Sequence, residues 1–173
     1  MAESKEGDIY WHAPNPRAII PLDEAKPSRS LRKKMEKGIF SFTRNKEFEK
    51  VIVGCSEREE TWISQEIIDT YSELHYLGYA HSVETWQDEK LVGGLYGVSM
   101  GGAFFGESMF NYVSDASKAA FYHLIEHLQN KKFMLLDSQY INDFTKKLGA
   151  IQISRNLYLN ILEKAINLPC SFD

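Results

Sequence analysis

The segment FMLLDSQY, residues 133–140, places an acid and an amide directly after an apolar run. The run at residues 133–136 is typical of a short strand that is buried on both faces. Polar side chains at the carboxyl end of such a strand are a common location for chemistry in α/β and α+β folds. Because side chains alternate along a strand, Asp137 and Gln139 should point to the same side. An adjacent acid and amide can pass polarisation along a hydrogen bond, although neither is a strong nucleophile.

The same pair also fits a purely structural role. Asp137 could cap a helix near residues 142–148, and Gln139 could be a solvated loop residue. The local pattern alone leaves both interpretations open.

A second carboxylate, Glu107, follows Gly106 in the segment GESMF. A carboxylate at the end of a strand could recognise a cationic amine, or it could pair with a lysine. The neighbouring Met109 and Phe110 suggest the wall of a pocket, which favours the recognition of an amine.

Glycine is dense between residues 93 and 106, where six glycines occur. Turns account for Gly101 and Gly102, whereas glycines inside a strand often mark a bulge or the close approach of a ligand. The segment contains neither GxxxxGK[ST] nor a GxGxxG that opens a helix, so it is not a phosphate loop. The pattern that holds the pyrophosphate of coenzyme A in acetyltransferases is also missing. We therefore expect no cofactor.

The histidines and cysteines show no pattern of metal ligands. His123 and His127 are four residues apart but lack the glutamate of HExxH. Two histidines at this spacing are typical of a pair on a helix surface. Cys55 and Cys170 are far apart, with no CxxC, which indicates a reducing compartment and no metal site. A Ser-His-Asp triad has no nucleophile elbow to support it.

Composition narrows the function classes. The chain has 173 residues, a formal net charge of −4, 43% hydrophobic and 25% charged residues, which suits one globular domain. The acidic balance argues against general binding of nucleic acid over the whole surface. The polar start MAESKEGD is not a signal peptide, and no apolar run is long enough for a membrane span. We expect a cytoplasmic monomer without membrane contact.

Two features could nevertheless contact nucleic acid locally. Trp11 and Trp62 could stack on a base, although core packing is the simpler interpretation of either residue. The one cluster of positive charge could bind phosphate or be an ordinary solvated helix face; it contains Arg29, Arg32, Lys33, Lys34 and Lys37.

Hydrophobic periodicity predicts an α+β domain. Four of the five prolines lie in residues 1–27, which disfavours regular structure there. Beyond them, period and cap signals predict helices and antiparallel strands. The expected helices are residues 29–37 after the cap Ser28, 48–54, 61–78, a segment from 114 or 115, 142–148 and a segment from Ser154; the expected strands are 39–43, 81–86, 91–99, a segment from 103, 133–136 and 150–153. This order matches the acetyltransferase-like fold, a similarity at the level of fold only.

Several segments together resemble the leucyl/phenylalanyl-tRNA–protein transferase family. They run in the family's order over nearly the whole chain, and they include YWHAPNPRAII, SRSLRKKM, TWISQEI, HSVETW, LVGGLYGV, FFGESMF, ASKAA, LLDSQY and NDFTKKLGA. Members usually carry a longer amino-terminal region before the WHAPNPR-like segment, whereas only the residues before Tyr10 precede it here. We therefore expect residues 1–27 to be the remnant of a small amino-terminal domain and residues 28–173 to be the transferase domain.

The resemblance implies an acetyltransferase-like fold that works without coenzyme A. It also implies that Leu or Phe, and Met by the limited discrimination of an apolar pocket, moves from aminoacyl-tRNA to the α-amine of a protein. The acceptor would begin with Arg or Lys, and the transfer would mark it for N-degron proteolysis. The partners would be charged tRNA and proteins with a basic first residue.

The resemblance also assigns roles to individual residues. Asp137 and Gln139 would be the catalytic pair, and Glu107 would seat the amino terminus of the acceptor. Trp11 and Trp62 would stack on the terminal adenosine. From the cluster of positive charge itself we further expect the basic helix to contact the tRNA backbone through Arg29, Arg32 and Lys33. An apolar pocket for the donor side chain would consist of Leu95, Phe104, Met109, Phe121, Leu124 and Leu136.

Two alternatives belong to other classes. A relative with a shortened amino terminus could bind charged tRNA or peptide amino termini without transfer, although the retention of Asp137, Gln139 and Glu107 argues against it. Acetylation by acetyl-coenzyme A is disfavoured because the pyrophosphate loop is missing.

Overall fold

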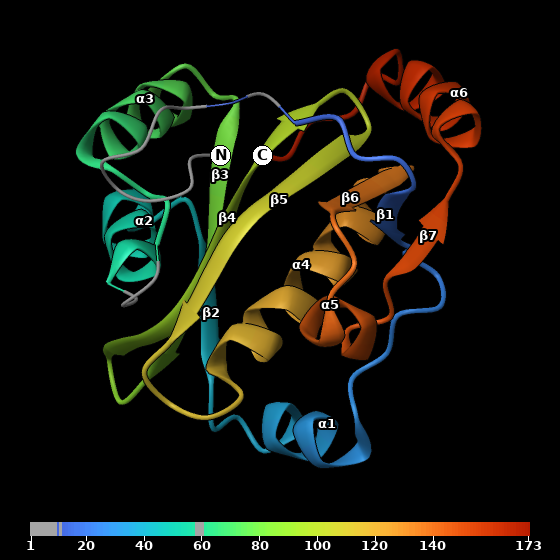
Figure 1. Cartoon of the computed structure of the whole chain (residues 1–173). Coiled ribbons are helices and arrows are strands. Elements are labelled where there is room, and N and C mark those ends of the chain that lie inside the picture. The colour runs from blue at the N-terminus through green and yellow to red at the C-terminus, as the bar shows by residue number, and fades with distance from the viewer. Residues whose placement is uncertain (1–9, 11, 58–60) are drawn as a thin grey trace.

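The computed structural model describes residue 10, residues 12–57 and residues 61–173. Within them seven strands form one mixed sheet in the order β2-β3-β4-β5-β6-β1-β7 (Figure 1). Neighbouring strands are antiparallel except β5 and β6, which are parallel. The strands are β1 (Arg17–Ile20), β2 (Ser41–Arg44), β3 (Ala80–Gln87), β4 (Lys90–Met100), β5 (Ala103–Asn111), β6 (Leu135–Gln139) and β7 (Ile151–Ile153).

Helices cover both faces of the sheet, which confirms the α+β class. They are α1 (Arg29–Glu36), α2 (Phe48–Ser56), α3 (Gln65–Tyr76), α4 (Ala116–Asn130), α5 (Asp143–Lys147) and α6 (Arg155–Ile166). Alternation along β5 and β6 separates the faces: Phe104 and Leu136 join the core beneath α4, whereas Ala103 and Leu135 pack with α6 residues. Phe110 packs with α2 and α3 on that second face.

Local sequence explains most element boundaries. Ser28, Ser64 and Ser154 cap α1, α3 and α6, each accepting a hydrogen bond from a backbone N–H in the first turn. The starts predicted at Ser28 and Ser154 are thereby confirmed. The hairpin of β3 and β4 turns at Asp88 and Glu89, both with positive φ, within the predicted turn.

Several predicted boundaries were wrong, including the start of β2, which is Ser41 rather than residue 39. Helix α2 continues through Gly54 to Ser56, so this glycine does not end the helix. It provides space for the ring of Phe110, which would lie 2.9 Å from a Cβ at this position. Helix α3 starts at Gln65 rather than at residue 61, so Trp62 precedes the helix. Strand β6 runs from Leu135 to Gln139 instead of from residue 133 to residue 136, and Met134 is 47% exposed.

The glycines of β4 are explained by packing within the protein. A Cβ on Gly93 would lie 2.7 Å from the Cβ of Ala116, and one on Gly94 would lie 2.8 Å from the carbonyl oxygen of Val83. A Cβ on Gly97 would collide with the ring of Phe104. The interpretation that these glycines admit a ligand is therefore replaced by close packing of helix and sheet.

The proline-rich segment contributes a strand, contrary to the expectation that it lacks regular structure. Strand β1 lies between Pro16 and Pro21 and pairs with β6 on one side and β7 on the other. Residues on both sides of the boundary expected at residue 27 therefore contribute strands to the same sheet. The prolines at both ends limit β1 to four residues but leave the N–H groups of the strand itself available for pairing.

Candidate active site

The sheet splits between its two parallel strands. Strands β5 and β6 pair only where residues 103–105 lie beside residues 135–137. Beyond this contact the strands separate, and a cavity of about 770 Å³ occupies the split. Residues from both faces line it, including Trp62 on the side of α3 and Phe121 from α4. A bound group in this cavity could therefore be contacted from both faces of the sheet.

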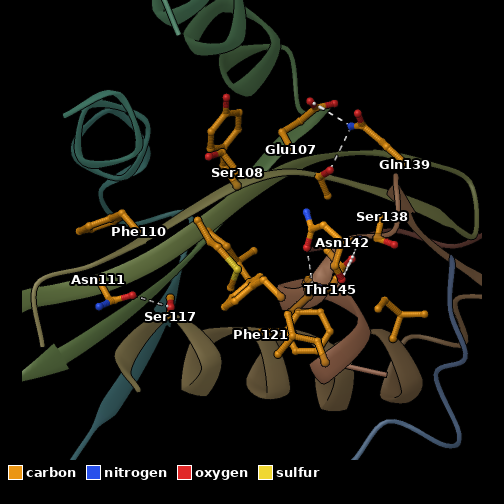
Figure 2. A pocket seen from close by; sticks show the side chains of 18 of the residues that line it. Glu107, Ser108, Phe110, Asn111, Ser117, Phe121, Ser138, Gln139, Asn142 and Thr145 are labelled. Atoms are coloured by element: carbon orange, nitrogen blue, oxygen red, sulfur yellow. Dashed lines mark hydrogen bonds between the residues drawn. The ribbon is translucent and has the colours of Figure 1, made fainter. Parts of the chain in front are cut away.

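Strand β5 carries a bulge where it leaves β6. Tyr96 of β4 lies opposite Ser108 and Gly97 lies opposite Gly106, so Glu107 is an extra residue. Bulges bend a strand and change the direction in which a side chain points. Here the carboxylate of Glu107 lies beside Gln139 of β6 (Figure 2).

Strand β6 carries a matching bulge on the other side of the split. Ile19 of β1 lies opposite Asp137 and Ala18 lies opposite Gln139, so Ser138 is the extra residue. Gln139 has φ 64°, a left-handed conformation that costs a residue other than glycine roughly 1–3 kcal/mol and needs contacts to hold it.

The carboxylate of Asp137 provides those contacts. Its side chain is fully buried and its Oδ1 accepts a hydrogen bond from the backbone N–H of Gln139 at 2.8 Å. Arg17 donates to both carboxylate oxygens, with an Nη2–Oδ2 distance of 2.7 Å, and the hydroxyl of Tyr158 donates to Oδ2 at 2.6 Å. Burial, followed by the neighbouring carboxylate, raises the pKa of Tyr158, so its hydroxyl remains a donor. Asp137 is thus a paired anion that fixes the main chain of Gln139.

The side-chain amide of Gln139 extends away from Asp137. Its Nε2 donates to the carbonyl oxygen of Gly106 at 3.1 Å and to Oε2 of Glu107 at 3.3 Å (Figure 2). The sequence suggested a hydrogen bond between the side chains of Asp137 and Gln139. Instead, the side chain of Asp137 accepts a hydrogen bond from the main chain of Gln139. The alternative role of Asp137 as a helix cap is also excluded, because Asn142 caps α5 through the N–H of Thr145.

Glu107 is a carboxylic acid whose pKa is raised by its surroundings. Burial raises its pKa from 4.5 to about 7, and hydrogen bonds from Gln139 and Tyr71 partly oppose this rise. The hydroxyl of Tyr71, on α3, is kept protonated because its own burial and the nearby Glu107 raise its pKa. Near neutral pH, Glu107 can therefore exist in both charge states.

Five of the six residues expected to form the donor pocket line the cavity; these are Leu95, Met109, Phe121, Leu124 and Leu136. Phe104 does not line it, because its fully buried ring stacks on Phe172 in the core, with centroids 5.5 Å apart. Trp62 lines the cavity beside Gly54 and Glu57, while Trp11 lies outside the described residues. The basic side chains Arg29, Arg32 and Lys33 are exposed on α1, away from the split (Figure 1).

Sequence reasoning missed Arg17, Tyr158 and Tyr71. Arg17 contacts an acid 120 positions away, a separation that no local pattern reveals. Its one signal was a charged residue opening the otherwise apolar segment RAII within the WHAPNPR-like motif. Tyr158 and Tyr71 lie on amphipathic helices, where an aromatic residue is normally read as core.

No group of three or more His, Cys, Asp and Glu side chains in residues 12–57 and 61–173 could hold a metal ion. In the same part of the chain, none of the helices combines the length and apolar character needed to cross a membrane.

Comparison with solved structures defines the class of fold. The structure of L-PGS from Bacillus licheniformis matches with a TM-score of 0.55 at 13% sequence identity, over 88% of this chain and 65% of that one. Together with the split mixed sheet, this match supports the acetyltransferase-like fold predicted from the order of elements.

Sequence comparison then defines the family. A model described as leucyl/phenylalanyl-tRNA protein transferase matches residues 19–163. The leucyl/phenylalanyl-tRNA–protein transferase of Chlorobaculum tepidum is 51% identical over 99% of this chain and 91% of its own, and that of Gloeobacter violaceus is 49% identical over 99% and 89%. The chain belongs to the leucyl/phenylalanyl-tRNA protein transferase family and is an aminoacyltransferase.

The raised pKa of Glu107 predicts an unusual dependence of stability on pH. Because the folded protein binds this proton more tightly than the unfolded chain does, stability is lost as the pH rises from about 4.5 through about 7. Glu107→Gln removes this loss. We expect its melting temperature to match that of the wild type near pH 5 and to be higher at pH 8. The corresponding increase in the free energy of unfolding at pH 8 should be about 1–3 kcal/mol.

The measurement is a series of thermal melts between these pH values, with Glu73→Gln on the exposed face of α3 as the control. A constant difference between Glu107→Gln and the wild type at all pH values would contradict the raised pKa.

Proposed function

We propose that the protein transfers Leu, Phe or Met from aminoacyl-tRNA to the α-amine of cytoplasmic proteins that begin with Arg or Lys, which destines them for N-degron proteolysis. The observation that carries this proposal is the contact between Gln139 and Glu107 across the split, at the end of an apolar pocket. Family membership supports the reaction, and the charge of the cavity supports the choice of acceptor.

The chemistry requires little beyond positioning. An aminoacyl ester is already activated, so the amine can attack its carbonyl carbon directly. The new bond joins the amine nitrogen to that carbon, and the bond that breaks joins the carbon to the ribose oxygen. The amine must lose a proton, and the leaving ribose oxygen must gain one.

Gln139 is suited to position the amine rather than to act as a strong base. Because its Nε2 is engaged by Gly106 and Glu107, its carbonyl oxygen remains to accept a hydrogen bond from the acceptor's amine. Asp137 contributes indirectly by holding the main chain of Gln139. Glu107, with a pKa of about 7, can bind the ammonium group or take its proton. A hydroxyl of the donor's ribose is a second acceptor for the proton.

The cavity carries negative charge that suits a basic first residue. Glu107 lies inside it and Glu57 at its margin, where the hydroxyl of Tyr112 donates to Glu57 at 2.6 Å. Among the described residues that line the cavity there is no lysine or arginine. An acceptor that begins with Arg or Lys brings two positive groups, its amine and its side chain, to these carboxylates.

The donor side chain fits the opposite wall. Met109, Phe121, Leu124 and Leu136 present apolar surface on the side of α4. An apolar pocket discriminates by about 1–3 kcal/mol for each methylene, so we expect several large apolar amino acids to be accepted. Trp62 lies on the other side, where a stacked nucleobase would gain about 1–3 kcal/mol.

The direct test is the transfer of labelled leucine from leucyl-tRNA to a peptide that begins with Arg. We expect efficient transfer to this peptide, little to a peptide that begins with Glu, and none to an acetylated one. Gln139→Ala should reduce the rate at saturating substrates by at least about a hundredfold, the usual scale for a positioned acid–base group.

Gln152→Ala, an exposed glutamine of β7, provides the control and should keep the wild-type rate. Normal turnover by Gln139→Ala would remove this residue from the proposed mechanism. Binding of leucyl-tRNA without transfer by the wild type would favour a binding protein over an enzyme.

The donor pocket predicts a change of selectivity in Met109→Ala. Enlarging the pocket should shift the ratio of Phe to Leu transferred when the two charged tRNAs compete, because the longer aromatic side chain gains room. Phe104→Leu is the matched control: its site is core, so it should lower the melting temperature and leave the ratio unchanged. An unaltered ratio in Met109→Ala, with a lowered melting temperature, would assign Met109 to the core as well.

A further inference from the structure

A second cavity, of about 800 Å³, is lined by residues at the starts of α1 and α4 and by residues of α5. Figure 1 shows where these three helices lie in the fold. We name this cavity the basic cleft, after its lysines. It is lined by Lys26, Ser28, Leu31, Asn111, Ser114, Asp115, Ser117, Lys118, Tyr122, Phe144, Lys147 and Leu148.

The positive charge of the basic cleft is largely available. Lys26 and Lys147 are exposed, and within the described chain neither forms an ion pair. Asp115 is the one carboxylate among the lining residues described, and it is bonded to Lys118 at 3.3 Å and to Lys34 at 2.7 Å. The cleft therefore has a net positive lining on a protein whose net charge is −4.

The basic cleft is continuous with the cavity of the split. Asn111, Ser117, Phe144 and Leu148 line both. At this junction the hydroxyl of Ser117 donates to Oδ1 of Asn111 at 3.0 Å (Figure 2). A continuous path thus leads from a lining that contains lysines to a lining whose described charged side chains are all acidic. These are Glu57, Glu107 and Asp137, of which Asp137 is paired with Arg17.

We propose that the basic cleft binds the phosphodiester backbone of the donor's single-stranded 3′ end, next to the terminal nucleoside that carries the amino acid. This inference rests on the proposed function and adds to it a route for the donor. The terminal nucleoside would pass Asn111 and Ser117 into the split, while the preceding phosphates remain beside Lys26, Lys118 and Lys147.

The charge of the basic cleft favours this occupant. Grooves that follow a single-stranded backbone are positively charged, and lysine binds phosphate as a point charge. The exposed basic face of α1 begins directly after Ser28, a residue of the cleft, so the positive surface continues from the cleft along α1, where the double-stranded part of the donor would follow. The two joined cavities thereby separate the anionic donor backbone from the cationic acceptor.

The experiment compares three donors with increasing numbers of phosphates: leucyl-adenosine, a leucylated CCA trinucleotide and leucyl-tRNA. The variants are Lys26→Gln and Lys147→Gln, singly and together, and Lys164→Gln on the exposed face of α6 is the control. The readouts are kcat and KM for each donor, KM for the Arg-initiated peptide, and the salt dependence of kcat/KM.

We expect each cleft variant to raise KM for leucyl-tRNA and for the trinucleotide by at least about threefold, with kcat unchanged. Each should also make the slope of log kcat/KM against log salt shallower by about 0.7, the value for one contact with a single strand. Leucyl-adenosine, which lacks the preceding phosphates, should react equally well with every variant.

Three outcomes would overturn the inference: an unchanged salt slope, an equal loss with leucyl-adenosine, or a rise in KM for the peptide alone. The last outcome would assign the cleft to the acceptor protein. If the wild type transferred leucine from none of the donors, the proposed function would fail. The cleft would then be tested by salt-dependent binding of the uncharged trinucleotide to the same variants, and equal binding by all of them would contradict it.

Discussion

The buried carboxylate of Asp137 is the constraint on which the active-site region depends. A fully buried anion is costly unless it is paired, and removal of one partner typically costs about 3–5 kcal/mol. Asp137 meets this demand with Arg17 from β1, Tyr158 from α6 and the backbone N–H of Gln139. The guanidinium also lies over the ring of Tyr158, 5.1 Å from its centroid. One side chain thus ties three elements together and holds a left-handed residue at the end of β6.

Because Asp137 holds the end of β6 in place, strands β5 and β6 can separate there while the residues beside the gap keep defined positions. Bulges at Glu107 and Ser138 occur where β5 and β6 part, and the amide of Gln139 bridges the strands through Gly106 and Glu107. The cavity so formed reaches both faces of the sheet. Acidic groups lie on the side proposed for the acceptor, and apolar side chains from α4 lie on the side proposed for the donor amino acid. Burial of Glu107 raises its pKa to about 7, which makes either charge state accessible near neutral pH and suits the proposed transfer of a proton.

Local sequence was sufficient for features that depend on neighbouring residues. It predicted a buried strand next to Asp137, the long hairpin, the caps Ser28 and Ser154, and the position of Glu107 beside an apolar wall. It could not predict the partner of Asp137, because Arg17 is distant in sequence and lies in a segment whose prolines argue against a strand. It also misread Phe104 and the glycines of β4, since hydrophobicity and glycine content do not distinguish a cavity wall from a packed core. The glycines between residues 93 and 106 were compatible with a bulge, but the bulged residues Glu107 and Ser138 could be located only once the partner strands were known.

The measurement that tests this account most directly is the rate of leucine transfer by Tyr158→Phe, which removes one hydroxyl from Asp137 and keeps the aromatic ring. Loss of a hydrogen bond to a charged group corresponds to about 1.5–3 kcal/mol. If that bond positions Gln139, kcat should fall by about tenfold or more, with KM for leucyl-tRNA unchanged and the protein still folded by thermal melt. The exposed Tyr79→Phe should behave as the wild type. An unchanged kcat in fully folded Tyr158→Phe would show that the active site does not depend on how the carboxylate is held.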